Sequence, residues 1–167
     1  MTRIDLKLEP LTAEAFLPYG DVIEVSDSNE VIQINYGKTE RHHDLAKIDV
    51  ADGGGNAIIS IFRSIASQLP LQVKVMERHP IGSQAFMPLT KNPYIVVVAP
   101  AGELDSCKLR AFIAQPDQGV NYHKGTWHHY CLGLNVRNDF LVVDRGGAGH
   151  NCDELNIPEE FEIYVNH

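Results

Sequence analysis

Apolar and polar residues alternate along short stretches of this chain, and turn-forming residues separate these stretches at intervals of roughly ten residues. Alternation places every second side chain on the same face, which is the pattern of a β-strand with one buried face. Glycine, proline and asparagine separate the stretches, for example at residues 53–56 and 91–93. The pattern predicts ten strands, at residues 22–25, 31–36, 57–62, 73–78, 85–87, 94–99, 109–113, 119–123, 128–132 and 139–144.

Helical signals are confined to two short segments. Residues 12–17 predict a helix that is capped by Thr12 and ends before Pro18, and a second short helix is expected to begin at Pro158. Many short strands with so little helix indicate an all-β antiparallel sandwich or barrel. A length of 167 residues fits one domain with a sizeable core, so residues 1–167 are expected to form a single domain.

Charge and composition exclude several classes of partner. A net charge of −8 argues against nucleic-acid binding, which depends on lysine and arginine, but one or two arginines in a cleft could still hold an anionic substrate. The longest apolar run, residues 95–101, is too short to span a membrane, and the N-terminus lacks the apolar core of a signal peptide. Three widely spaced cysteines indicate reduced thiols. We therefore expect a cytoplasmic protein that binds a small molecule.

A barrel of this size can enclose one small ligand, so polar residues that point inward are candidates for chemistry. One such group lies on two successive predicted strands. Strand parity places Glu77 and His79 on one face of the first strand. Gln84 and Phe86 share a face of the next strand, after a turn that contains proline and glycine.

A second polar group surrounds a turn at Gly125. His123 and His128 lie on either side of this turn, so both could approach the same small site. The parity of the following strand places Tyr130 on the same face as His128. His129 has the opposite parity and is expected to point outward.

The two polar groups resemble the two motifs of the cupin family. The first has the spacing of His-x-His-x4-Glu, with Glu77, His79 and Gln84 at the ligand positions, and the second has Gly125 and His128 in the register of Pro-x-Gly-x2-His. The resemblance implies a cupin-like antiparallel β-barrel of the double-stranded β-helix or jelly-roll type. It also implies a divalent metal held by Glu77, His79, Gln84 and His128, with two of the four usual ligand types replaced.

A longer resemblance, to the ureidoglycolate lyases, extends over nearly the whole chain. It is carried by ordered blocks at residues 18–24, 34–46, 59–63, 77–88, 109–113, 118–129 and 139–147. The resemblance implies cleavage of (S)-ureidoglycolate to glyoxylate and urea in allantoin breakdown. It further implies a homodimer of cupin-like subunits and suggests nickel as the metal.

The chemistry of ureidoglycolate agrees with these residues. One carbon of the substrate carries a carboxylate, a hydroxyl and a urea nitrogen, so its cleavage requires a base for the hydroxyl proton and an acid for the departing nitrogen. Histidine can act in either role near neutral pH. We expect His128 or His79 to act as the base or as an orienting metal ligand, and His123 to act as the acid.

The substrate carboxylate requires a cationic partner, and the guanidinium of arginine has the matching geometry. Arg63 is the favoured candidate, although an ordinary surface ion pair would also explain an arginine at this position. Gln84, Phe86 and Tyr122 are expected to contact the substrate. Trp127 is expected to form part of the pocket wall and to exclude water.

The segment at residues 41–44 contains more polar groups than a turn requires. Arg41 and His43 in this segment are expected to bind substrate, either as part of a lid or as a wall donated by a partner subunit. A solvated surface loop is the alternative.

Two other functions are consistent with the sequence. An amidohydrolase would split the urea group of the same compound and release ammonia, which requires a water activated by closely bound metal ions. A non-catalytic cupin module would bind a small acid or sugar without converting it. Release of urea and glyoxylate would distinguish the lyase from both alternatives.

Overall fold

The computed structural model describes all residues of the chain, 1–167, and consists almost entirely of β-strands. The larger of its two main sheets has ten strands. Eight of them follow the order β16 (Asp153–Asn156), β8 (Val75–Arg78), β13 (Trp127–His128), β10 (Tyr94–Ala99), β11 (Arg110–Ala114), β1 (Thr2–Pro10), β17 (Phe161–Asn166) and β7 (Leu71–Val73). The other two are β14 (Leu132–Leu134), beside β10, and β6 (Ala66–Ser67), beside β14.

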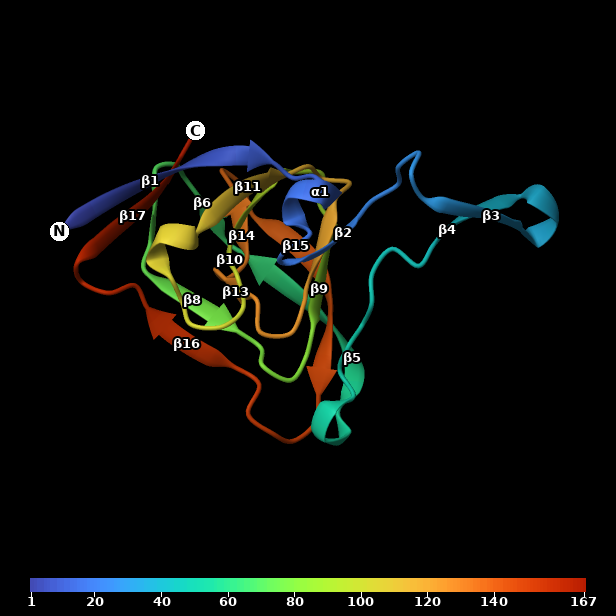
Figure 1. Cartoon of the computed structure of the whole chain (residues 1–167). Coiled ribbons are helices and arrows are strands. Elements are labelled where there is room, and N and C mark those ends of the chain that lie inside the picture. The colour runs from blue at the N-terminus through green and yellow to red at the C-terminus, as the bar shows by residue number, and fades with distance from the viewer.

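A five-stranded sheet packs against the larger one. Its order is β2 (Gly20–Ile23), β12 (Gly119–Tyr122), β9 (Gln84–Pro88), β15 (Asn138–Gly146) and β5 (Asn56–Ser64). The last two strands, β3 (Glu30–Ile34) and β4 (Thr39–His43), form a hairpin that projects from the body (Figure 1).

Helical structure is limited to one α-helix and three 3-10 turns. The elements are α1 (Ala13–Phe16), η1 (Asn35–Gly37), η2 (Asp52–Gly54) and η3 (Ser106–Lys108). The predicted cap of α1 is confirmed, because the hydroxyl of Thr12 accepts a hydrogen bond of 3.1 Å from the backbone N–H of Ala15. None of these segments is long and apolar enough to cross a membrane.

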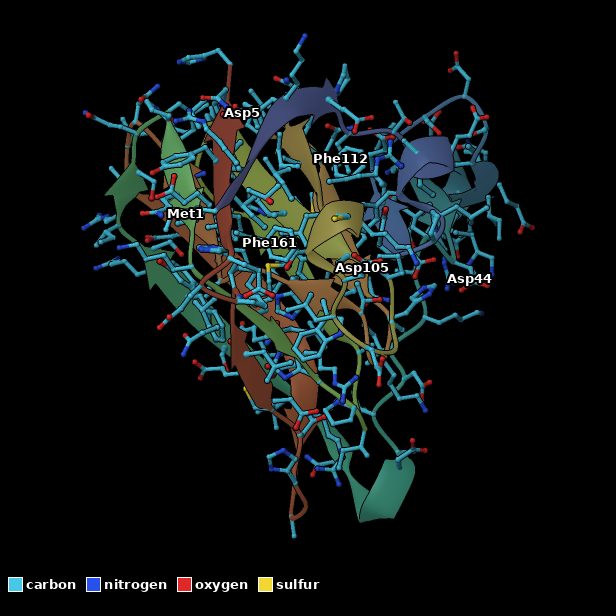
Figure 2. All side chains as sticks on the ribbon, turned by 60° about the vertical axis from the view of Figure 1, so that its left-hand side comes forward. Met1, Asp5, Asp44, Asp105, Phe112 and Phe161 are labelled. Atoms are coloured by element: carbon cyan, nitrogen blue, oxygen red, sulfur yellow. The ribbon has the colours of Figure 1, made fainter.

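Strand β10 contributes to two separate hydrophobic cores, one on each of its faces. The first core lies between the two sheets and contains Phe86, Phe140 and the fully buried Phe112, which is labelled in Figure 2. The second core lies on the other side of β10. Because side chains alternate along a strand, β10 contributes Tyr94, Val96 and Val98 to the first core and Ile95, Val97 and Ala99 to the second.

The larger sheet curls around this second core. Lys74 alone separates β7, at one end of the strand order, from β8, near the other end. Val73 and Met76, which lie on either side of this junction, are both buried in the second core together with Ile163 of β17. The result is an all-β, barrel-like architecture of the cupin type, which confirms the predicted fold class.

Each of the ten predicted segments overlaps a strand, but four details were wrong. The strand predicted at residues 73–78 is interrupted at Lys74, between β7 and β8. The sheet is mixed and not purely antiparallel, because β1 runs parallel to both β11 and β17. No helix begins at Pro158, whose carbonyl instead accepts a turn hydrogen bond from Phe161 at the start of β17. The strand predicted at residues 128–132 is interrupted, since β13 ends at His128 and β14 begins at Leu132.

Candidate functional site

Three ionisable side chains meet between the ends of the two sheets. Glu77 lies on β8, His79 follows the end of that strand, and His128 ends β13. The register pairs His128 with Glu77 on adjacent strands, so their side chains share a face. His128 Nδ1 lies 3.7 Å from a carboxylate oxygen of Glu77, and the rings of His79 and His128 are 5.2 Å apart. We refer to these residues and Gln84 as the histidine cluster.

His128 is the most buried member of the cluster, with 1% of its surface exposed. The ring of Tyr122 stacks on it in parallel at a centroid distance of 4.2 Å. Burial, with a smaller effect of His79, lowers the pKa of His128 to about 3, so its imidazole is neutral at neutral pH. Nδ1 donates to the carbonyl oxygen of His129 at 3.2 Å, which leaves Nε2 with a lone pair and no hydrogen-bond partner.

Both ring nitrogens of His79 have partners that can accept hydrogen bonds. Nδ1 donates to the carbonyl oxygen of Asn151 at 2.6 Å, and Nε2 lies 3.2 Å from the side-chain oxygen of Gln84. The Gln84 amide is oriented by Asp144, whose carboxylate accepts from its nitrogen at 3.0 Å. A hydrogen bond from His79 to Gln84 therefore requires protons on both ring nitrogens and a cationic ring. The other arrangement that would satisfy both atoms is a cation bound between Nε2 of a neutral His79 and the side-chain oxygen of Gln84.

Glu77 is partly buried beside a second carboxyl group. Its neighbour across β8 and β16 is Glu154. Burial is the main cause that raises the pKa of Glu77 above the ordinary 4.5; His79 opposes this shift and Glu154 adds to it. A raised pKa makes this carboxylate a better proton acceptor than an exposed glutamate.

The histidine cluster has the donor groups that a divalent metal requires. One donor atom from each of Glu77, His79 and His128 lies within 4.8 Å of the others. Backbone carbonyls hold Nδ1 of both histidines, and such partners orient imidazole ligands of metals. A cation would also give a partner to the unpaired Nε2 of His128. The residues present therefore fit a metal held by the predicted set, Glu77, His79, Gln84 and His128.

The predicted pocket walls lie on opposite sides of β13. Tyr122 and Phe86 pack edge to face at 5.9 Å, next to the ring of His128. Trp127 precedes His128 on the strand and therefore faces the second core, where its indole N–H donates to the carbonyl of Gly102 at 2.9 Å. Phe86 and Tyr122 thus border the cluster, whereas the expectation for Trp127 was wrong.

His123 does not reach the histidine cluster. It follows Tyr122 in the chain, and its Nε2 lies 3.0 Å from the carboxylate of Asp21. It belongs to a separate surface cavity of about 420 Å³, lined by Asp21, Lys47, Asp49, Ser83, His123 and Lys124. The geometry therefore does not support His123 as the acid beside His79 and His128.

The expectation that His129 points outward was wrong. Because β13 ends at His128, the alternation of faces does not continue to the next residue. The side chain of His129 is buried, burial lowers its pKa, and its Nδ1 donates to the carbonyl of Tyr130 at 3.0 Å. Tyr130, which was expected to share the face of His128, is exposed instead.

The arginines of the two main sheets already have partners. Arg63 forms two hydrogen bonds of 3.0 and 3.1 Å with Asp139. The adjacent residue of β5, Phe62, packs on Phe86 beside the cluster, so Arg63 lies on the opposite face of the strand. The prediction that Arg63 binds the substrate carboxylate is corrected accordingly. The buried Arg145 donates to backbone carbonyls, including that of Asp52. Other sheet arginines form ion pairs with carboxylates: Arg3, Arg78 and Arg110.

Arg41 and His43 lie on β4 of the projecting hairpin, away from the cluster of their own chain. Figure 2 shows Asp44, which follows β4, on the opposite side of the molecule from Met1. Within one chain these residues therefore form neither a lid nor a wall of the histidine cluster.

Two residues that the sequence analysis missed complete the hydrogen bonding of the site, Asp144 and Asn151. Asp144 could have been found from parity, because Phe140, Val142 and Asp144 share one face of a predicted strand and the first two are buried in the core. Asn151 contributes a backbone carbonyl to His79 from a loop. No sequence pattern marks such a contact.

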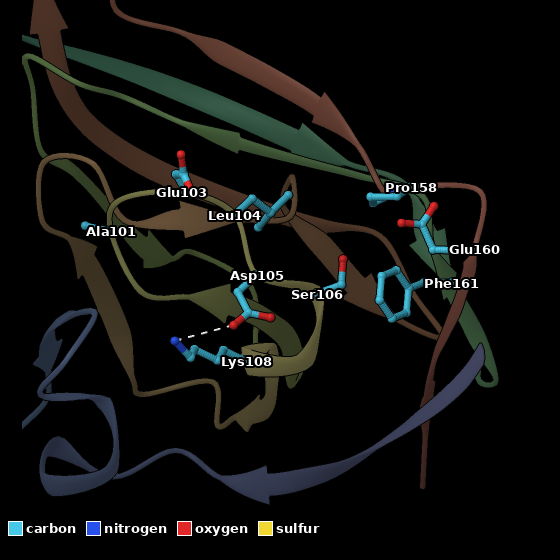
Figure 3. Close-up of a pocket in the computed structure, with 9 residues that line it drawn as sticks. All are labelled: Ala101, Glu103, Leu104, Asp105, Ser106, Lys108, Pro158, Glu160 and Phe161. Carbon is cyan, nitrogen blue, oxygen red and sulfur yellow. Dashed lines mark ion pairs between the residues drawn. The ribbon is translucent and has the colours of Figure 1, made fainter. Parts of the chain in front are cut away.

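A larger surface cavity, of about 700 Å³, lies elsewhere in the molecule (Figure 3). It is lined by Ala101, Glu103, Leu104, Asp105, Ser106, Lys108, Pro158, Glu160 and Phe161. It contains one exposed ion pair, between Lys108 and Asp105 at 3.4 Å, and shares no residue with the histidine cluster. The cluster therefore remains the better candidate for acid–base chemistry.

Comparisons of the sequence with a family model and with curated proteins indicate the same family. A family model described as ureidoglycolate lyase matches residues 3–164. The ureidoglycolate lyase of Burkholderia mallei (strain NCTC 10229) is 58% identical over 154 residues, covering 92% of this chain and 90% of the relative. That of Pseudomonas entomophila (strain L48) is 53% identical over 162 residues, 96% of each protein. That of Pseudomonas aeruginosa (strain LESB58) is 51% identical over 162 residues, 96% of this chain and 95% of the relative.

Proposed function

This chain belongs to the ureidoglycolate lyase family, and we propose that it cleaves ureidoglycolate to glyoxylate and urea at the histidine cluster. The observation that carries the assignment of the site is the buried, neutral His128 beside Glu77 and His79, with its Nε2 left without a hydrogen-bond partner. A buried polar atom without a hydrogen bond is costly, and a bound ligand would remove this cost.

The first half of the reaction is removal of the hydroxyl proton. An imidazole with a pKa of about 3 is a weak base, so His128 accepts a hydrogen bond from the substrate and orients it. Glu77 is the stronger proton acceptor, because burial raises its pKa. As Glu77 takes the hydroxyl proton, the oxygen forms the carbonyl of glyoxylate and the electron pair of the breaking carbon–nitrogen bond moves to nitrogen.

The second half is protonation of the departing nitrogen. The cationic form of His79 carries a proton on Nε2, directed to the oxygen of Gln84 at 3.2 Å. Transfer of this proton to nitrogen releases urea, and the proton held by Glu77 restores His79 for the next turnover. Gln84, oriented by Asp144, presents an amide oxygen that can accept from the urea N–H groups.

As an alternative arrangement we propose a divalent metal, for which the family resemblance suggests nickel, held by Glu77, His79, Gln84 and His128; Glu77 and His79 would then be ligands and not the free proton acceptor and donor. When bound, the metal would polarise the oxygen atoms of the substrate. Metal analysis of protein purified without chelators or affinity tags tests this proposal, and His79→Ala should reduce the bound metal. Full activity in strong chelator with no detectable metal would contradict it and leave these residues as direct substrate contacts.

We also propose that the protein works in the cytoplasm as a homodimer, on ureidoglycolate formed in allantoin breakdown. The three free cysteines support a reducing compartment. Support for the dimer comes from the projecting hairpin and from apolar side chains left exposed on the edge strand β5, among them Ile59 and Ile61.

Product analysis tests the reaction. Purified protein with racemic ureidoglycolate should release urea and glyoxylate in equal amounts, with no ammonia in the primary reaction. Stoichiometric ammonia before urea would identify the amidohydrolase, and binding without any product would identify a non-catalytic module.

A further inference from the structure

The hairpin of β3 and β4 lacks support from its own chain. Its two five-residue strands form a separate sheet and pair only with each other. Figure 1 shows the hairpin extending away from both main sheets. A two-stranded hairpin alone is marginally stable in water and needs a further layer to pack against. The regular pairing of this hairpin therefore points to a covering surface outside its own chain.

One face of the hairpin combines apolar and basic side chains. The register places Ile32 opposite Arg41, and strand parity adds two further pairs to the same face, Ile34 with Thr39 and Glu30 with His43, so that one carboxylate also lies at its edge. We call this the basic face of the hairpin. Gln33 lies on the other face, opposite Glu40. The basic face can therefore bury isoleucine side chains while it presents a guanidinium and an imidazole.

A complementary strip is uncovered on the body of the molecule. Ile58 and Phe62 lie on the inner face of β5, because they pair with Asp144 and Phe140 of β15, whose side chains face the interior. Nevertheless Ile58 is 40% exposed and Phe62 is 37% exposed. The larger sheet leaves this strip open, and the strip borders Asp144 and hence the Gln84 side of the histidine cluster.

The charges of the two surfaces are also complementary. The cluster and its border contain the carboxyl groups of Glu77, Asp144 and Glu154, and the arginines of the main sheets are already paired. A substrate with a carboxylate needs a cation at such a site, since an unpaired negative charge beside these groups is unfavourable. Within one chain, Arg41 is an arginine without a carboxylate or carbonyl partner, but it lies on the distant hairpin.

We propose that a second copy of this chain covers the inner strip of β5 with the basic face of its hairpin and places its Arg41 at the histidine cluster, where the guanidinium binds the substrate carboxylate. In a twofold dimer the same contact occurs twice, so each site contains residues of both chains. This inference rests on the proposed lyase function for its substrate, but the exchange of hairpins can be tested without activity.

Paired inactive variants test the shared site. Arg41→Ala should lower kcat/KM about 10- to 100-fold through loss of a charged hydrogen bond, and Arg41→Lys should recover part of it. Arg41→Ala and Glu77→Gln chains, co-expressed with different tags and purified as the mixed dimer, should regain about half of the wild-type activity per dimer. Only one site of the mixed dimer then has an intact Glu77 together with an intact Arg41 from the other chain.

The result that overturns the proposal is a mixed dimer no more active than its parents, which would place Arg41 in the site of its own chain or in neither. Near-normal activity of Arg41→Ala would overturn it too. Gln33→Ala, on the opposite face of the hairpin, is the matched control and should remain active.

Light scattering tests the hairpin contact apart from catalysis. Ile34→Asp should convert the dimer to a monomer, whereas Gln33→Asp should leave it dimeric. A wild-type monomer, or a dimer unaffected by Ile34→Asp, would overturn the exchange of hairpins whether or not the protein releases urea.

Discussion

Burial acts in opposite directions on two neighbouring residues of the cluster. Because it disfavours the charged form of each group, it raises the pKa of Glu77 and lowers that of His128. The pKa of the Glu77 carboxyl therefore moves toward neutral pH, whereas the pKa of the His128 imidazole moves away from it. This difference explains why proton transfer is assigned to Glu77 and orientation of the substrate to His128, although histidine is the usual candidate for a base at neutral pH.

Glu77→Gln tests this division of roles. The substitution keeps the size and a hydrogen-bonding oxygen but removes the proton acceptor, so kcat should fall about 10²- to 10⁴-fold. Wild-type activity should fall as the pH is lowered through the raised pKa of Glu77, because the acceptor is then protonated. The residual activity of Glu77→Gln, measured by urea release, should lack this acidic limb. An unchanged acidic limb in the variant would assign it to another group.

A comparison of His79→Ala with His123→Ala tests which histidine supplies the acid. His79 contacts Gln84 and lies beside His128, whereas His123 pairs with Asp21 at a different cavity. We expect His79→Ala to lower kcat about 10²- to 10⁴-fold and His123→Ala to have a much smaller effect. Circular dichroism of both variants checks their folding. A larger loss for His123→Ala would return the acid role to that residue.

Residue positions were predictable from the sequence where a strand continued and not where it ended. Parity correctly placed Glu77 and His79 together because β8 is regular up to Arg78. It failed for His129 because β13 stops one residue earlier. Contacts from loops, such as the Asn151 carbonyl that holds His79, depend on the tertiary fold and have no local pattern.

At the level of elements, the two terminal strands show what a closer reading of periodicity would have found. Ile4, Leu6 and Leu8 alternate in β1, and Phe161, Ile163 and Val165 alternate in β17. Both sets pack on the second core, which explains why the chain beyond Pro158 forms a strand and not a helix. Their parallel pairing joins the two ends of the chain and could not be derived from either segment alone.

Substitutions in β10 test whether this strand is buried on both faces. Val96 belongs to the first core and Val97 to the second, and both side chains are buried. Val96→Ala and Val97→Ala should each lower the free energy of unfolding by about 2 kcal/mol, from lost burial and the cavity that remains. Leu141→Ala, on the partly exposed outer face of β15, is the control and should cost less. In urea unfolding, a neutral Val97→Ala would contradict an enclosed second core.

For the whole molecule, the position of the site follows from the way the two cores are separated. The larger sheet curls around the second core and contributes its other face to the first, so polar side chains gather where β8 and β13 approach β9 and β12. The short apolar segments predicted the strands and the all-β class. The curl and the projecting hairpin depend on pairings far apart in the sequence, which no local pattern contains.

Buried neutral histidines also make the stability of the whole molecule sensitive to mild acid. The pKa values of His128 and His129 are both lowered by burial from the ordinary 6.5. As the pH falls through 6.5, the unfolded chain binds protons at these residues and the folded chain does not. The free energy of unfolding must therefore decrease with falling pH in this range. Glu77, with its raised pKa, has the opposite effect, but one carboxyl acts against two imidazoles.

We therefore expect the midpoint of urea unfolding to decrease between pH 6.5 and about pH 5. Paired carboxyls such as Glu9 and Asp139 have lowered pKa values, so the stability they contribute is lost only at lower pH, below the ordinary 4.5 and 3.8. The decrease above pH 5 thus reports the histidines. His129→Gln removes one titrating group and should make the decrease smaller. A midpoint that is constant over this interval, or an equal decrease in His129→Gln, would show that buried imidazoles do not control it.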